Sequence, residues 1–342
     1  MVKNNFLMTT CFLTTAFFTA NAYADQAAMP DDHAPIGVMA EHSHKQGEWM
    51  LFYRYNRMDM QGNRSGNNDV STANVLSNFM VAPLDMRMEM HMFGGMYGVN
   101  NDLTLMAMAP YVKKTMGHIT RAAMQFETES EGVGDIKISG LYTLYQKNTH
   151  SDSSRNGQKL LLNLGASLPT GSIDERGDTP MGANQKLPYP MQLGSGTVDP
   201  LLGITYVQRY DAWSWGAQAN TVLRFGKNSE GYRLGNEYGL TSWIARNLNE
   251  YASLSLRLDG KSWKDIEGQD SELNPLMVPT ARTDLRGGER VDALIGLNLY
   301  QPHGALSGHR LAIEYGLPVY QRLDGPQLEV DHRFTIGWQW AF

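Results

Sequence analysis

The sequence ends in Asp331-His-Arg-Phe-Thr-Ile-Gly-Trp-Gln-Trp-Ala-Phe342, a stretch in which two kinds of side chain alternate. One face carries Phe334, Ile336, Trp338, Trp340 and Phe342, and the other carries Arg333, Thr335, Gly337, Gln339 and Ala341. Aromatic residues crowded toward one end suit the girdle where a membrane strand meets lipid headgroups, while small and polar residues face a lumen. The pattern therefore predicts a membrane-spanning β-strand.

This strand needs a neighbour on each side. A free edge in lipid would leave backbone N–H and C=O groups unpaired at a cost of several kcal/mol each, so it must pair with the first strand. Its final aromatic residue, Phe342, also resembles the terminal signal that the barrel-assembly machinery of bacteria reads. We therefore expect an all-β fold, a closed antiparallel transmembrane β-barrel of about twelve strands.

Residues 1–24 have the features of a signal peptide. Lys3 gives a positive start, residues 6–18 form an apolar region, and Ala22-Tyr-Ala24 provides a small-x-small cleavage site. The single cysteine, Cys11, lies in this leader, so the rest of the chain offers no disulfide, thiolate metal site or cysteine nucleophile. An exported barrel is expected in the outer membrane of the cell.

Charge and hydropathy exclude two classes of protein. The formal net charge is −6, and loss of Lys3 with the leader makes the remainder more acidic, which argues against nucleic acid as a partner. No run of about 18 apolar residues follows the leader, so helical membrane spans are excluded. The low mean hydropathy fits a barrel, because only alternate residues of each strand face lipid.

The chain divides into a polar segment, residues 25–47, expected in the periplasm, and a barrel, residues 48–342. Alternating segments that read as strands occupy residues 48–60, 86–99, 103–116, 134–145, 160–168, 197–210, 213–225, 232–244, 251–259, 291–300, 311–317 and 331–342. The connections at 100–102, 211–212 and 247–249 are tight, whereas those around 61–85, 119–131, 170–195, 261–286 and 318–330 are long. Short periplasmic turns and long outer loops are the expected asymmetry.

Four Gly-containing stretches resemble a known family. They are Leu193-Gly-Ser-Gly-Thr-Val-Asp-Pro-Leu-Leu-Gly203, Gly134-Asp-Ile-Lys-Ile-Ser-Gly140, Leu168-Pro-Thr-Gly-Ser172 and Asp32-His-Ala-Pro-Ile-Gly-Val-Met39. Together they look like the outer-membrane β-barrel "transporter" family labelled for the meta-pathway of phenol degradation. The resemblance covers most of the chain after the leader. It implies the barrel fold and offers no catalytic residues.

Methionine is the most unusual feature, with 20 in the chain. Alternation places a candidate group on the lumen face of the first three strands: Met58, Met60, Met86, Met88, Met90, Met92, Met106 and Met108. Arginine at the lipid midplane costs about 2–4 kcal/mol, so Arg87 and Glu89 on the opposite face are expected above the bilayer. The group is expected to converge in the outer half of the lumen.

Three interpretations of these methionines stay open. They can fill gaps in the lumen as flexible apolar side chains. They can form a thioether site for a soft ligand such as Cu(I) or Ag(I). They can also line a path for an apolar or aromatic solute.

Histidines and charged residues supply two further candidate groups. His33, His42 and His44 could bind a metal ion with Asp32 or Met39, or could simply belong to a solvated polar leader. The expected lumen charges are Arg54, Asp135, Lys137, Asp199, Arg224, Arg257, Asp292, Arg310, Glu314 and Arg333. In a barrel of this width, mixed charges either form an ion-pair network that fills the bore or line a conduction path.

The favoured function is a channel or transporter for a small solute, linked to soft-metal (copper) or aromatic-compound handling. The alternatives are a metal-binding outer-membrane barrel without transport and an outer-membrane hydrolase. No Gly-x-Ser-x-Gly or other nucleophile signature stands out, so we do not expect an enzyme. The expected partners are outer-membrane lipid, the barrel-assembly machinery and a small solute or metal ion.

Overall fold

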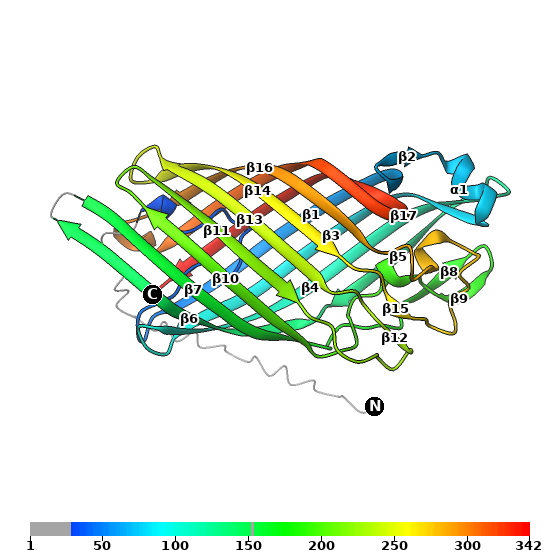
Figure 1. Cartoon of the computed structure of the whole chain (residues 1–342), viewed down its shortest axis with the longest axis horizontal. Helices are drawn as coiled ribbons and strands as arrows, with labels where there is room; N and C mark the ends of the chain where they lie inside the picture. Colours follow the sequence, from blue (N-terminus) through cyan, green and yellow to red (C-terminus); the bar gives the residue numbers. More distant parts are fainter. Residues whose placement is uncertain (1–28, 152–153) are drawn as a thin grey trace, which may run out of the picture.

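Long antiparallel strands form a sheet that closes on itself (Figure 1). The computed structural model describes residues 29–151 and 154–342, so the expected leader, residues 1–24, lies outside the described residues. The ring consists of β1 (Trp49–Gly66), β3 (Val81–Gly98), β4 (Leu103–Thr120), β6 (Ile136–Ser151), β7 (Ser154–Leu168), β10 (Asp199–Arg209), β11 (Trp213–Val222), β13 (Glu237–Asn247), β14 (Ala252–Trp263), β16 (Gly288–Tyr300) and β17 (His309–Ala341). β17 pairs with β1 and closes the barrel. The predicted fold is confirmed.

The last strand, β17, crosses the wall twice. Its residues up to Leu323 pair with β16, and those from Leu323 onward pair with β1. Both of its ends lie at one end of the barrel, because the Ala341 N–H donates to the Gly308 carbonyl at 3.3 Å. The eleven ring strands of the described residues, with β17 counted twice, therefore make twelve passes.

Alternation along each strand decides which side chains face outward. On β14 the exposed fractions are 43% for Leu254, 60% for Leu256 and 53% for Leu258, whereas the intervening Ser255 and Arg257 are buried. The terminal stretch behaves in the same way, with Trp338 exposed and Thr335 and Gln339 buried. Leaving these leucine side chains in water would cost about 25 cal/mol of hydrophobic free energy for each Å² of exposed apolar surface. The outer surface therefore suits lipid.

The two ends of the barrel differ in their connections. One end, which we term the tight-turn end, carries the short turns at residues 99–102, 210–212 and 248–251, the C-terminus and η4 (Gly304–Leu306). The other, the loop end, carries β2 (Asn68–Val70), α1 (Thr72–Asn78), β5 (Gln125–Val133), β8 (Arg176–Thr179), β9 (Gly182–Lys186), η2 (Tyr189–Met191), β12 (Tyr232–Arg233), β15 (Glu267–Gly268) and η3 (Pro279–Ala281) (Figure 1). The predicted difference in length between the connections of the two ends is confirmed, and the assignment of the tight-turn end to the periplasm stays a prediction. Within the described residues, none of the helices has both the length and the apolar character needed to cross a membrane.

Residues 29–48, which we term the plug segment, run through the bore, and only their last part, where Lys45, Gln46 and Gly47 are exposed, lies at the tight-turn end. The segment begins with η1 (Pro30–Asp32), and side chains from around the ring bind its backbone. Gln218 on β11 donates to the Met39 carbonyl at 2.7 Å, and the His44 N–H donates to Thr104 on β4 at 2.8 Å. Arg310 on β17 donates to the Pro30 carbonyl at 3.1 Å. The sequence predicted a polar segment ahead of the barrel. In the structure, side chains that face the lumen form hydrogen bonds with the backbone of the described part of this segment and hold it inside the bore.

Candidate functional site

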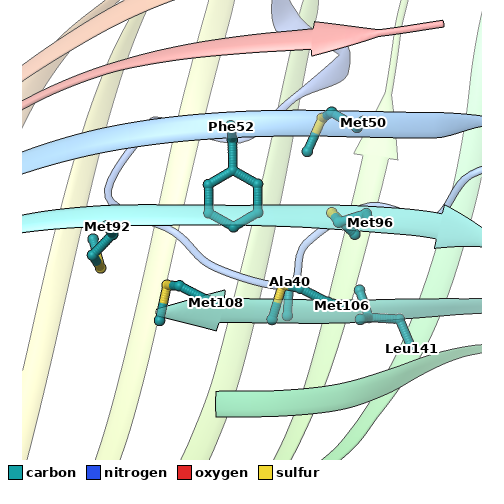
Figure 2. Close-up of a cluster of buried hydrophobic side chains, with 8 residues drawn as sticks. All are labelled: Ala40, Met50, Phe52, Met92, Met96, Met106, Met108 and Leu141. Carbon is teal, nitrogen blue, oxygen red and sulfur yellow. The ribbon is translucent and has the colours of Figure 1, made fainter. Parts of the chain in front are cut away.

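Six of the eight predicted methionines divide between two clusters, and Met58 and Met88 belong to neither. The plug-side cluster contains Met50, Phe52, Met92, Met96, Met106, Met108 and Leu141 with Ala40 of the plug segment, and Met90 packs against it. Figure 2 shows Ala40 beside Met106 and Met108, with the plug ribbon crossing the cluster. The loop-side cluster contains Met86, Met116, Leu187 and Met191, with Met60 and Leu328 packed against it.

Strand register explains why there are two clusters. Met106 lies opposite Met96, close to the tight turn at residues 99–102, whereas Met86 lies opposite Met116 near the loop end. The expected convergence of all the methionines in the outer half is therefore wrong for Met106 and Met108. Those two residues start β4 just after the turn and cannot reach the level of Met86. Any soft-metal role of these thioethers stays a prediction.

A cavity of about 380 Å³ occupies the bore on the loop side of the plug segment. Met58, Met60, Met86 and Met116 line it on one side, and the ring of Tyr189 contributes to its boundary. Its polar lining includes Glu237, Lys261, Arg290 and Gln321. Met88 is half-buried and lies opposite Met58 across the β1–β3 pair. The site thus combines thioether and aromatic surface with a few charged groups.

The connection that contains η2 covers this cavity at the loop end. The Lys114 ammonium on β4 donates to the carbonyls of Pro190 at 2.8 Å and Gln192 at 2.5 Å. The Ser130 hydroxyl on β5 donates to the Met191 carbonyl at 2.6 Å. Side chains of the wall therefore fix η2 in place. Sequence reasoning missed this element, because its wall contacts join residues 61 to 78 positions apart.

Lys186 organises the loops above the cavity. Its ammonium group, 2% exposed, lies 2.8 Å from both Asp270 and Glu230. Burial lowers the pKa of Lys186, but the two carboxylates outweigh burial and hold that pKa above its ordinary value. Glu230, Asp270 and Glu272 have the spacing of a metal site. Lys186 pairs with Glu230 and Asp270, and Arg176 pairs with Glu272 at 2.8 Å, so we assign the three carboxylates a structural role.

Most of the predicted lumen charges pair with one another. Arg257 donates to both carboxylate oxygens of Glu314, at 2.8 and 2.7 Å. The remaining pairs of this network are Arg257–Asp259 at 3.2 Å, Arg333–Asp259 at 2.9 Å, Arg333–Asp292 at 2.5 Å and Arg290–Asp292 at 3.0 Å. The network joins β14, β16 and β17. The geometry supports an ion-pair network that fills one side of the bore.

Other predicted charges hold the plug segment and the loops. Arg54 donates to the Val38 carbonyl at 3.3 Å, and the Arg310 guanidinium lies 4.2 Å from the Tyr300 ring centroid. Asp199 pairs with Arg224, which also binds Glu237 at 2.8 Å. Asp135 accepts hydrogen bonds from the backbone of Gly171 and Ser195, at 3.0 and 2.8 Å. Lys137 is half-buried.

The three predicted histidines of the plug segment come together. The ring centroids of His33 and His42 are 3.9 Å apart, and those of His42 and His44 are 4.9 Å apart. Glu41, which sequence reasoning missed, lies 2.6 Å from Nδ1 of His42 and 3.7 Å from Nδ1 of His33. His42, His44 and Glu41 are buried, so the interpretation of a solvated leader is wrong for them.

Asp32 and Met39, the two further ligands expected beside the histidines, contact other residues. Asp32 pairs with Arg209 at 3.2 Å, and the Met39 sulfur accepts a hydrogen bond from Arg54. The sequence signal that could have revealed the cluster is the run Glu41-His-Ser-His44, which places a carboxylate next to two closely spaced imidazoles.

Comparison with known proteins identifies relatives of this barrel. The chain is similar to an outer membrane channel from Pseudomonas putida F1, with 15% identity and a TM-score of 0.60 over 88% of this chain and 97% of that one. It also matches a FadL homologue of Pseudomonas aeruginosa, with 11% identity and a TM-score of 0.42 over 86% of this chain and 90% of that one. No curated protein sequence matches the chain.

The first of these likenesses supports the barrel fold. A family model described as "Putative MetA-pathway of phenol degradation" matches residues 62–275, which is more than half of the chain. The match includes three of the four Gly-containing stretches that carried the resemblance in the sequence. The chain therefore belongs to this family of outer-membrane-type β-barrels.

Proposed function

We propose that this protein lies in the outer membrane and conducts small apolar solutes with an aromatic ring. The observation that carries the proposal is the cavity of about 380 Å³ lined by Met58, Met60, Met86 and Met116 inside a closed barrel. Its volume falls within the range of about 300–1,000 Å³ that is usual for small-molecule sites. The cavity is therefore large enough for a monocyclic aromatic molecule.

The lining matches such a solute chemically. Methionine sulfur makes favourable contacts with aromatic rings, and flexible thioether side chains adapt to ligands of different shape. Lys261, Arg290 and Gln321 at the same cavity offer donors to a phenolic oxygen or a carboxylate. The description of the family, which refers to phenol degradation, supports the same class of solute.

Conduction also requires the plug segment to move. This segment fills the bore on the tight-turn side, where Ala40 packs into the plug-side cluster. A solute in the cavity would therefore stop at the plug segment until the hydrogen bonds to its backbone rearrange. We place the gate at residues 29–48 and the solute site on its loop side.

The test measures uptake in cells. A strain without general porins would express the protein and receive radiolabelled phenol or a sugar of similar mass. We expect faster initial uptake of phenol and little change for the sugar. Met60→Lys, which places a charge in the cavity, should reduce phenol uptake several-fold.

Met181→Lys is the matched control, because Met181 is 65% exposed in the loop between β8 and β9. This control should transport phenol at the rate of the unchanged protein. Met60→Leu keeps an apolar side chain and removes sulfur, so it should retain most phenol uptake. Phenol uptake equal to that of cells without the protein would exclude the proposed function.

A further inference from the structure

Three nitrogen atoms in the bore lack hydrogen-bond partners. They are Nδ1 of His33, Nε2 of His42 and Nε2 of His44, and none has a partner among the described residues although all three are buried. Buried polar atoms are normally paired, and exceptions point to strain or to an ion that binds there. All three nitrogens belong to the plug segment, outside the cavity of the proposed solute.

We propose that His33, Glu41 and His42 bind a divalent transition-metal ion, Zn²⁺ or Cu²⁺. One ligand atom from each residue lies within 4.8 Å of those of the other two. Bonds of about 2.0–2.1 Å to a tetrahedral Zn²⁺ place ligand atoms about 3.3 Å apart. The Glu41 carboxylate oxygen lies 2.6 Å from Nδ1 of His42 and 3.7 Å from Nδ1 of His33, and these separations lie on either side of that value. Ligation through Nδ1 of His42 would replace its present hydrogen bond to Glu41. Small side-chain shifts would therefore complete the geometry.

The donor set selects the ion. Imidazole nitrogen and carboxylate oxygen suit Zn²⁺ and Cu²⁺, whereas Cu(I) and Ag(I) prefer the sulfur of the separate methionine clusters. A ligating histidine coordinates through a neutral imidazole nitrogen, and the buried Nδ1 of His33 has no hydrogen-bond partner among the described residues. The Glu41 carboxylate supplies the single negative charge of the set.

Two guanidinium groups nearby do not compete for this carboxylate. Arg209 lies against the Asp32 carboxylate at 3.2 Å and donates to the Asp32 carbonyl at 2.7 Å. Arg310 donates to the carbonyls of Pro30 and Met29, at 3.1 and 3.0 Å. Both groups therefore have local acceptors, and Glu41 remains available to the ion.

Metal binding would connect two parts of the plug segment. His33 lies just after η1, whereas Glu41 and His42 lie on the part of the segment that returns toward β1. An ion shared by these parts would fix the fold of the segment in the bore. This site is independent of the proposed solute cavity, because none of its three ligands lines that cavity.

The test uses the full barrel, purified without a histidine tag and treated with a chelator. Titration calorimetry with ZnCl₂ or CuCl₂ alone should give one ion per chain. Glu41→Gln, which keeps the size of the side chain, and His42→Gln should each weaken binding at least tenfold. Retention of the heat-dependent electrophoretic shift of folded barrels would show that each variant folds.

His303→Gln is the matched control, because the His303 side chain is 63% exposed and lies outside the cluster. This variant should bind the ion as the unchanged protein does. The electron paramagnetic resonance spectrum of bound Cu²⁺ should also show hyperfine coupling to nitrogen, and His42→Gln should reduce this coupling. If the unchanged protein binds no ion, or if Glu41→Gln and His42→Gln bind as tightly as His303→Gln, the proposal is wrong, whatever the result for phenol uptake.

Discussion

Single residues in the bore contribute to stability according to their burial. The Glu314 side chain is 1% exposed and binds the Arg257 guanidinium through both oxygens. Both charges have lost most of their contact with water, so each depends on the other for compensation. Glu129 on β5, by contrast, is 46% exposed where it pairs with Lys113 at 2.8 Å. Water already solvates that second pair.

Glu314→Ala should therefore destabilise the barrel by up to about 3–5 kcal/mol, because the buried Arg257 would lose its bidentate partner and keep only the Asp259 carboxylate, at 3.2 Å. Glu129→Ala, the matched control, should cost about 0–1 kcal/mol. Denaturant unfolding in lipid vesicles, followed by tryptophan fluorescence, measures both free energies. Combining Arg257→Met with Glu314→Leu should recover most of the loss. Equal costs for the two single variants would contradict this account.

At the scale of elements, the plug segment differs from the strands that surround it. Apart from η1, its described residues form no helix or strand before β1, so lumen side chains must satisfy its backbone. Irregular backbone at membrane depth is tolerated where protein surrounds it. Gly37 lies against the wall, where an added Cβ would be 2.3 Å from Arg257 Nη2 and from Glu314 Oε2.

Gly37→Ala should displace the plug segment, because the two atoms that it would strike are fixed in a buried ion pair. We expect more frequent or larger openings in single-channel recordings from planar bilayers. Deletion of residues 30–44 should increase conductance further. Gly203→Ala is the matched control, since the nearest atoms to its added Cβ lie at 3.5 Å. A deletion variant that conducts like the unchanged protein would show that the segment does not limit conduction.

At the scale of the whole molecule, closure separates an apolar outer surface from a polar bore. Trp49 and Phe342 exchange two backbone hydrogen bonds of 2.9 Å where β1 meets the end of the chain. Arg87, which the alternation places on the outer face, is 52% exposed and lies 3.0 Å from Asp59. The methionines that alternate with Arg87 on β3, such as Met86 and Met88, therefore point inward, as predicted.

The orientation of the wall predicts a labelling pattern in membranes. Cys11, in the expected leader, is the only cysteine of the sequence, so replacing it with serine lets cysteines be introduced one at a time without background. Cysteines at Leu311, Tyr315 and Trp338 should react with a lipid-soluble reagent, because these side chains are 41%, 43% and 36% exposed on the outer face. Cysteines at the buried positions Thr335 and Gln339 should not. Stronger reaction of the second group would exclude the membrane orientation.

The sequence by itself determined the barrel, the side of each strand that faces lipid and the end that carries the long loops. These features depend on a period of two residues and on local turns, and both can be read within a short stretch of chain. Even the terminal stretch from Asp331 to Phe342 is sufficient to assign its own two faces.

Only the tertiary structure decided what fills the bore. Arg310 binds the Pro30 carbonyl across 280 positions of sequence, and closure of the ring brings the two together. Met106 and Met86 both face inward, but pairing between β3 and β4 sets them at different heights. His33 meets Glu41 and His42 only because the plug segment returns on itself inside the barrel. A local pattern specifies the face of a strand, whereas contacts across the bore depend on how the whole ring closes.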